Sequence, residues 1–173
     1  MGQARLARCC LSAGLSGKRA AIALGSNLGD RRAALQFAID RLSKLIANLT
    51  VSDCIETDPE GEGLEDQPRY LNAVAVGDTT LTARELLGGL LAIEQSYGRE
   101  RPYPGAPRTL DLDLILLGTV IENSPGLHVP HVRFRSRFFV LGPLAEIAPD
   151  MTDPVTSLKV SELLRNLLRD QSR

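Results

Sequence analysis

Two aspartates inside a hydrophobic segment are the residues best placed to do chemistry. Asp111 and Asp113 lie in the sequence PRTLDLDLILLG, residues 107–118. On a β-strand, alternate side chains share a face, so the two carboxylates would point the same way, ~6.7 Å apart along the strand. Carboxylates so placed can hold paired magnesium ions roughly 3.5–4 Å apart. Ile115 and Leu117 would continue the same face into the core. The alternative is that the acids only solvate a strand end, although like charges on one face repel.

The arginines cluster in sequence on both sides of these acids. Three precede the acids and three follow them: Arg99, Arg101, Arg108, Arg133, Arg135 and Arg137. Guanidinium groups are suited to binding phosphate oxygens in pairs. Acids that hold divalent metal, with arginines around them, are typical of a polyphosphate site, where catalysis is mostly positioning and charge neutralisation. Any single arginine is more often a solvated surface charge, so the prediction depends on the cluster.

Other motifs give weaker indications. His131 could donate to a phosphate oxygen or be a structural residue, and it has no partner at the spacing of a zinc site. The segment ALGSNLGD, residues 23–30, lacks the GxxxxGK[ST] pattern of a phosphate-binding loop, so we interpret it as a tight turn between a strand and a helix. Tyr70 and Asn72 alternate on one strand face, which suits a flat heterocycle that stacks on the ring and hydrogen-bonds the amide. Phe138 or Phe139 could complete the sandwich, and ordinary core packing is the alternative.

The elements that must position these residues alternate in type along the chain. We predict four strands over residues 20–24, 51–57, 70–76 and 110–117, and two helices between them, after Asp30 and Thr82. The first helix has an apolar face of Leu35, Ala38, Leu42, Leu45 and Leu49, and Glu85 completes a capping box for the second. A partly helical segment over 135–149 and a terminal helix over 160–168 follow. This order, βαββαβ, predicts an α+β, ferredoxin-like sandwich with two long loops, 58–68 and 98–107, and extra C-terminal helices.

Bulk properties set the remaining limits. The 173 residues suit one domain, and a net charge of −1 provides no general attraction to nucleic acid or to an acidic membrane. No apolar run approaches the ~18–20 residues that span a bilayer. Three cysteines without a pairing framework indicate a reducing compartment. We therefore expect a cytoplasmic protein with a basic, disordered tail at 1–19 and a single domain at 20–173.

The motifs together resemble one known family. ALGSNLGD, QPRYLNAV, GRER, PRTLDLDLILLG, VPH and RSRFFVLGPLAEIAP occur in the order found in 6-hydroxymethyl-7,8-dihydropterin pyrophosphokinase, over roughly residues 20–168. The resemblance implies a magnesium-dependent transferase that moves pyrophosphate from ATP to the hydroxymethyl group of the reduced pterin, releasing AMP, in folate biosynthesis. It also implies a ferredoxin-like fold with ATP and pterin side by side, bridged by two Mg²⁺ ions.

The resemblance also assigns roles to individual residues. Asp111 and Asp113 match the magnesium ligands, and with Arg99 and Arg101 they form the expected catalytic set. The expected ATP-binding positions are Glu94, Arg99, Arg101, Arg108, His131 and Arg137. The expected pterin-binding positions are Thr57, Tyr70, Asn72 and Phe139. The chain departs from the family pattern at Leu91, Val132 and Glu60, and in a shorter loop at 102–107.

Two other functions use part of the same residues. A metal-dependent nucleotide hydrolase would need the acids and arginines but not Tyr70, Asn72 and Phe139. A non-catalytic ferredoxin-like module that binds a small ligand would leave the paired acids unexplained. We expect the pyrophosphokinase, acting as a monomer on small molecules, without a nucleic acid or membrane partner. The general base is left unassigned.

Overall fold

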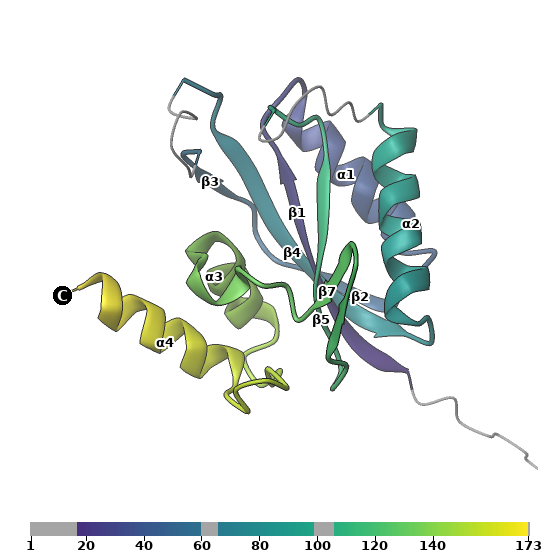
Figure 1. Cartoon of the computed structure of the whole chain (residues 1–173). Coiled ribbons are helices and arrows are strands. Elements are labelled where there is room, and N and C mark those ends of the chain that lie inside the picture. Colours follow the sequence, from purple (N-terminus) through teal and green to yellow (C-terminus); the bar gives the residue numbers. More distant parts are fainter. Residues whose placement is uncertain (1–16, 60–65, 99–105, 173) are drawn as a thin grey trace, which may run out of the picture.

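A single antiparallel sheet organises the chain (Figure 1). The computed structural model describes residues 17–59, 66–98 and 106–172. The strands of the sheet are β1 (Lys18–Ser26), β2 (Ala47–Val51), β3 (Ile55–Thr57), β4 (Tyr70–Thr79) and β5 (Asp111–Leu117). The helices are α1 (Arg31–Leu42), α2 (Ala83–Ser96), α3 (Phe138–Ile147) and α4 (Val160–Gln171). A small hairpin of β6 (Glu122–Ser124) and β7 (Leu127–Val129) and a 3₁₀ turn, η1 (Phe134–Ser136), connect β5 to α3.

The strand order confirms the predicted ferredoxin-like fold. The sheet runs β2-β4-β1-β5, β3 extends the β2 side by pairing with β4, and every one of these pairs is antiparallel. If β2 and β3 are counted as one interrupted strand, the chain order is βαββαβ. The two predicted crossover helices are α1 and α2, and the predicted extra C-terminal helices are α3 and α4.

Each face of the sheet has its own hydrophobic core. Side chains from one face pack with α1 and α2, as Ile22 and Leu24 of β1 do with Leu35 and Leu86. Side chains from the other face pack with η1, α3 and α4. In Figure 1, α1 and α2 lie together on one side of the sheet, while α3 and α4 lie on the other. Among the described residues, no helix has the length and apolar character needed to cross a membrane.

The predicted helix starts are confirmed. The Asp30 carboxylate accepts a hydrogen bond from the Ala33 N–H at 3.0 Å at the start of α1. Thr82 and Glu85 form the predicted capping box of α2, in which each side chain accepts the backbone N–H of the other residue. These local bonds satisfy amide groups that have no partner inside a helix.

Two element boundaries differ from the predictions. The strand predicted over 51–57 is divided between β2 and β3. The Ser52 hydroxyl accepts a hydrogen bond from the Val74 N–H at 3.0 Å, which interrupts the regular pairing with β4. The predicted helix face that included Leu45 and Leu49 is too long, since α1 ends at Leu42 and Leu49 lies in β2. The chain also enters β1 at Lys18, two residues earlier than expected, while residues 1–16 of the predicted tail lie outside the described residues.

A register shift corrects the predicted face of β5. Ile115 packs into the α3 core, on the face expected for a residue in phase with Asp111 and Asp113. Leu117 is buried but packs into the α1 and α2 core instead. The pairing of β1 with β5 shifts between Ala21 and Ile22, and this irregularity reverses the facing of the residues beyond it. The sequence pattern contains no signal for such a shift.

A buried carboxylate fixes the connection between α3 and α4. The Asp153 side chain has no exposed surface and accepts two hydrogen bonds from Arg135, at 2.7 and 2.8 Å. It also accepts the Thr156 hydroxyl at 2.6 Å and the Val155 N–H at 3.1 Å. Burial raises the pKa of this carboxyl, but these hydrogen bonds outweigh it and hold the pKa below its usual value.

We expect Asp153→Asn to lower the free energy of unfolding at pH 7 by about 2–4 kcal/mol, because Arg135 would lose its charged partner inside the protein. A depressed pKa stabilises the fold above the ordinary carboxyl pKa, so the difference from wild type should shrink as the pH falls below about 4. Urea unfolding at several pH values measures both. The matched control is Asp150→Asn, at an exposed carboxylate paired with Lys159, which should leave stability essentially unchanged. A loss that stays constant down to pH 2.5 would contradict this account.

Candidate active site

The floor of the site is a row of residues across three strands. Gly25 of β1 pairs with Asn72 of β4 on one side and with Asp111 of β5 on the other. One step further along, Ala23 pairs with Val74 and Asp113. Since neighbouring strands lie ~4.8 Å apart, the row places Asn72 and Asp111 roughly 10 Å apart, with a residue that has no side chain between them. The central strand therefore leaves open space between an amide and a carboxylate.

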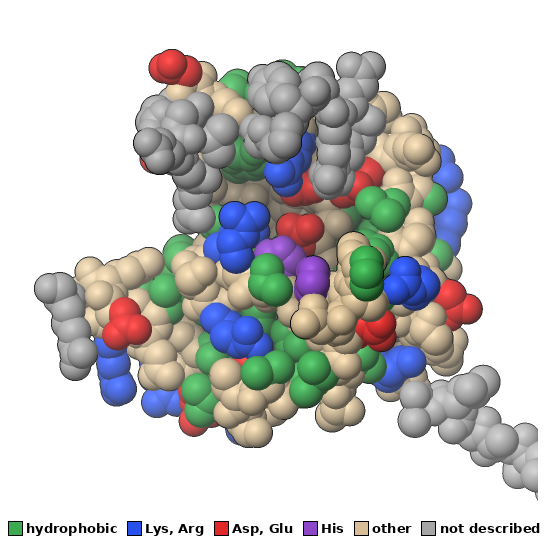
Figure 2. All heavy atoms as spheres, viewed as in Figure 1, with side chains coloured by type: hydrophobic (Ala, Val, Ile, Leu, Met, Phe, Trp, Pro, Cys, Tyr) green, Lys and Arg blue, Asp and Glu red, His purple; other side chains and the backbone are tan. Residues whose placement is uncertain are grey.

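This row opens into a cavity of about 310 Å³. Figure 2 shows it as a hollow with acidic, basic and histidine side chains around it. Eight of the twelve predicted site residues line it: Thr57, Tyr70, Asn72, Arg108, Asp111, Asp113, Arg137 and Phe139. Its remaining walls come from β1 and from Asp58, Ala73, Arg133 and Val140.

The β4 side of the cavity presents aromatic and amide groups. The Asn72 side chain donates to the Thr57 hydroxyl at 2.8 Å, which fixes which way its amide points. Asn72 is 6% exposed, so its remaining hydrogen-bonding capacity is directed at the cavity that it lines. Tyr70 stands beside it on the same strand face. Burial raises the pKa of the Tyr70 phenol, so its hydroxyl stays protonated. Together with Phe139 these groups suit a flat heterocycle.

The β5 side of the cavity holds the two acids and their cationic neighbours. Arg108 forms an ion pair with Asp111 through Nη1 and Oδ2. Burial, followed by the charge of Asp111, raises the pKa of Asp113 above its usual value. The two acids occupy alternate positions of β5 and both line the cavity, as predicted for one strand face. The described residues contain no group of three or more His, Cys, Asp or Glu that could hold a metal. Magnesium commonly takes only one or two carboxylates together with substrate phosphates and water, so this pair of acids fits it.

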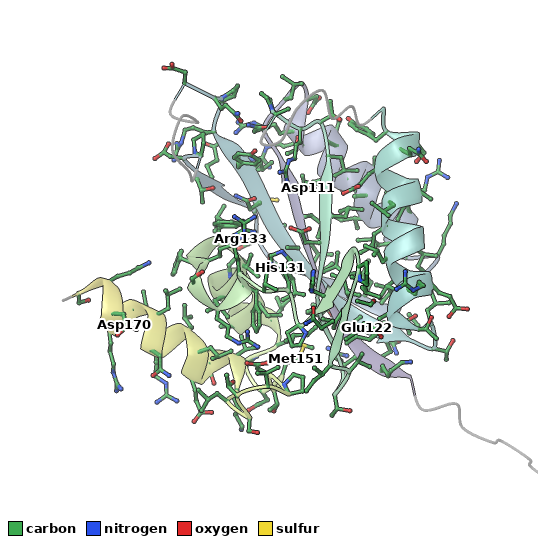
Figure 3. All side chains as sticks on the ribbon, viewed as in Figure 1. Asp111, Glu122, His131, Arg133, Met151 and Asp170 are labelled. Carbon is green, nitrogen blue, oxygen red and sulfur yellow. The ribbon has the colours of Figure 1, made fainter. Side chains whose placement is uncertain are left out.

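His131 lies beside the acids with a defined hydrogen-bonding state. Its Nε2 is 3.9 Å from the Asp113 carboxylate, and its Nδ1 accepts the Arg133 backbone N–H at 3.3 Å. Burial lowers the pKa of the imidazole; Asp113 opposes this effect, and the charges of Arg137 and Arg133 add to it. A neutral ring whose Nδ1 accepts must carry its proton on Nε2. In Figure 3, Asp111, His131 and Arg133 lie on the same side of β5, near one another.

Glu94, like His131, is a predicted site residue that the structure describes outside the cavity lining. Glu94 of α2 is 2% exposed, and its Oε1 accepts the Leu112 N–H at 2.6 Å, between the two acids. Its predicted contact with ATP stays a prediction, and the structure shows a contact with β5. Arg99 and Arg101 lie outside the described residues, as do Glu60 and most of the 102–107 loop. The other two departures, Leu91 and Val132, are exposed.

Some cavity residues were missed by sequence reasoning. Gly25 and Asp58 gave no separate signal, since each lies beside a residue with a stronger one. Arg133 was counted in the arginine cluster but received no role, although it is four residues from Arg137. The turn that follows β1 was underestimated, because Asn27 is 1% exposed and bonds two other segments. A buried asparagine cannot be distinguished from an exposed turn residue by its spacing.

The comparison with protein families shows which family the chain belongs to. The family model for 7,8-dihydro-6-hydroxymethylpterin-pyrophosphokinase, abbreviated HPPK, matches residues 21–149. The chain belongs to this family. Membership confirms the predicted function, transfer of pyrophosphate from ATP to 6-hydroxymethyl-7,8-dihydropterin in folate biosynthesis, and ATP as the co-substrate.

Two of the similar proteins are named as pyrophosphokinases of this pterin, and a third is a longer folic acid synthesis protein. The chain is 44% identical over 139 residues to the 2-amino-4-hydroxy-6-hydroxymethyldihydropteridine pyrophosphokinase of Pseudomonas aeruginosa, covering 79% of this chain and 85% of the relative. The Synechocystis enzyme of that name is 40% identical over 148 residues, covering 86% and 75%. The folic acid synthesis protein fol1 of Pneumocystis carinii is 38% identical over 148 residues, which make up 85% of this chain but only 20% of fol1.

Solved structures agree on the fold. A crystal structure titled as HPPK-DHPS in complex with substrates superposes with a TM-score of 0.70 at 13% identity, over 90% of this chain and 44% of that one. Wild-type HPPK-DHPS of Plasmodium falciparum with pteroate gives 0.67 at 13% identity, over 88% and 42%. The HPPK chain thus spans less than half of each of these solved chains. At such identity the likeness supports the ferredoxin-like fold alone.

We expect Gly25→Ala to weaken pterin binding about tenfold, because the new methyl would lie 3.1 Å from the Asn72 Oδ1 and would enter the cavity. Fluorescence titration with 6-hydroxymethyl-7,8-dihydropterin measures the effect. The control is Gly88→Ala on α2, whose added methyl meets open space and should slightly stabilise the helix. Unchanged pterin affinity in a folded Gly25→Ala variant would show that the pterin does not bind over the row of Asn72, Gly25 and Asp111.

Proposed function

We propose that this HPPK binds the pterin and Mg·ATP side by side across the Asn72–Gly25–Asp111 row and transfers pyrophosphate within the cavity. The observation that supports this most is the register of three strands. It places an aromatic and amide surface on β4 next to a carboxylate pair on β5, with only Gly25 and Ala23 between them. One cavity thereby offers a surface for a flat ring and a surface for a charged phosphate chain.

The pterin would occupy the β4 side. Tyr70 and Phe139 are placed to contact the faces of the ring, while Asn72 and Thr57 meet its polar edge. The hydrogen bond from Asn72 to Thr57 matters here, because it orders the amide before the pterin arrives. A pre-ordered amide loses less conformational entropy when it binds. The hydroxymethyl group of a ring held there would point toward β5.

The triphosphate would occupy the β5 side. Asp111 and Asp113 would hold two magnesium ions, which when bound neutralise phosphate charge and align the reacting groups. Arg108, Arg137 and the Nε2–H of His131 would contact phosphate oxygens. Arg137 is further positioned by the Phe139 ring, whose centroid is 5.3 Å from its guanidinium carbon. Arg99 and Arg101 complete the proposed phosphate contacts.

In the reaction, the hydroxymethyl oxygen of the pterin forms a bond to the β-phosphorus of ATP. The bond between that phosphorus and the oxygen bridging to the α-phosphate breaks, and AMP leaves with the electron pair. The hydroxyl proton passes to solvent as the new bond forms. Because the chain supplies charge and alignment and no covalent intermediate, the positions of its arginines and acids determine the rate. We further propose that the enzyme acts as a cytoplasmic monomer.

We expect Asp111→Asn to reduce the rate of AMP release by about 10³-fold or more, because one metal-binding carboxylate would be neutralised. The variant should also bind Mg²⁺ and the α,β-methylene analogue of ATP more weakly in calorimetry. Its pterin affinity in the absence of nucleotide should change little, since the β4 surface is intact.

The matched control for this variant is Asp78→Asn. Asp78 is in β4 at the far end of the sheet and contacts Arg19 and Asn48. This control should retain wild-type activity. Full AMP release by Asp111→Asn, or release that does not depend on Mg²⁺, would contradict the proposed role. A wild type that hydrolyses ATP equally well without pterin would favour the hydrolase alternative.

A further inference from the structure

A buried asparagine joins the two sides of the cavity. Asn27 follows β1 directly and is 1% exposed. Its Oδ1 accepts the Arg108 backbone N–H at 2.7 Å, and its own backbone N–H donates to the Arg108 carbonyl at 3.0 Å. Its Nδ2 donates to the Gln67 Oε1 and to the Pro68 carbonyl, each at 3.2 Å. One carboxamide therefore binds two segments that are 40 residues apart in sequence.

These segments lead into the two substrate surfaces. Gln67 and Pro68 come just before Tyr70 and Asn72, on the β4 side. Arg108 comes three residues before Asp111 and forms an ion pair with it. Ser26 strengthens only the second connection, because its hydroxyl donates to the Thr109 carbonyl at 2.7 Å. A movement of either segment must therefore break or bend a hydrogen bond to Asn27.

We propose that Asn27 is a positioning residue that couples the pterin side of the site to the nucleotide side. It does so by bonding the segments before β4 and β5 through the opposite ends of one side chain. This inference rests on the proposed placement of the substrates. Binding at one surface orders its segment, and the shared carboxamide transmits that order to the other. The two substrates should then raise each other's affinity, and the size of this effect should depend on Asn27.

The aspartate variant separates the two connections. In Asn27→Asp, one oxygen can still accept the Arg108 N–H, but the other faces the Gln67 and Pro68 oxygens with no hydrogen to donate. The link to β5 persists. In the link to the segment before β4, the hydrogen bond to the Pro68 carbonyl is lost and replaced by repulsion between two oxygens. Gln67→Ala removes part of the same link from its partially exposed side and tests the proposal without a buried charge.

The experiment measures the pterin dissociation constant by fluorescence, with and without saturating Mg²⁺ and α,β-methylene ATP. The constant without nucleotide divided by the constant with nucleotide reports the coupling. A loss of structure that weakens binding equally in both conditions would leave this ratio unchanged. We expect the ratio to fall about fivefold to tenfold in Asn27→Asp, and about twofold to threefold in Gln67→Ala. Asn48→Ala is the matched control, since its amide donates to Asp78 at 3.0 Å at the far end of the sheet. It should leave the ratio unchanged.

The outcomes distinguish this inference from the proposed function. If the wild type binds neither ligand, both proposals are overturned. If the wild type binds both but folded Asn27→Asp and Gln67→Ala keep the wild-type ratio, the coupling role of Asn27 is wrong and the proposed function stands. An equal loss of affinity in both conditions would also overturn it, because that result indicates a purely structural role. A selective fall in the ratio at an unchanged melting temperature supports it.

Discussion

The mutual repulsion of two carboxylates on one strand face is the constraint on which the site depends. Asp111 and Asp113 lie on β5, at the border of the sheet, and both are partly buried. Such a pair is costly without positive charge nearby, and burial, followed by the charge of Asp111, raises the pKa of Asp113. Arg108 supplies one counter-charge through its contact with Asp111. The arrangement favours the arrival of further positive charge, as the proposed Mg²⁺ ions would bring.

Holding these acids in position requires bonds to the backbone of β5 and of the segment before it. Glu94 of α2 accepts a hydrogen bond from the Leu112 N–H. At the end of β1, the Ser26 hydroxyl donates to the Thr109 carbonyl. The Asn27 amide oxygen accepts a hydrogen bond from the Arg108 N–H. The three side chains are almost fully buried, so water does not compete for these hydrogen bonds. The acid-bearing strand end is thus fixed from two directions, by groups that need not touch a substrate themselves.

The elements and most of the cavity residues could be predicted because their signals are local. Helix caps, strand alternation and the DLD spacing depend on neighbours within a few residues. As predicted, Asp30 and Thr82 cap their helices, and the two acids share a strand face. The predicted face of Leu117 and the single strand predicted over 51–57 were wrong, because each depends on pairing with a partner strand. The register shift between β1 and β5 and the Ser52 contact with Val74 both involve segments distant in sequence. The hydrogen bonds of Asn27 and Glu94 to distant segments were not predicted, for the same reason.

The sequence of β1 shows how one strand serves both the core and the site. On the α1 and α2 face it carries Ile22 and Leu24, which fill a closed core. On the opposite face its residues shrink toward the end of the strand, through Ala23 to Gly25, as α3 gives way to the cavity. Because β1 lies between β4 and β5, it is flanked by the proposed ring-binding side and the proposed phosphate-binding side. Small side chains there leave open the cavity in which we propose both substrates to bind, and the turn that follows bonds both flanking segments. The central position of β1 in the sheet thus accounts for the empty floor of the cavity and for the bridging asparagine beyond it.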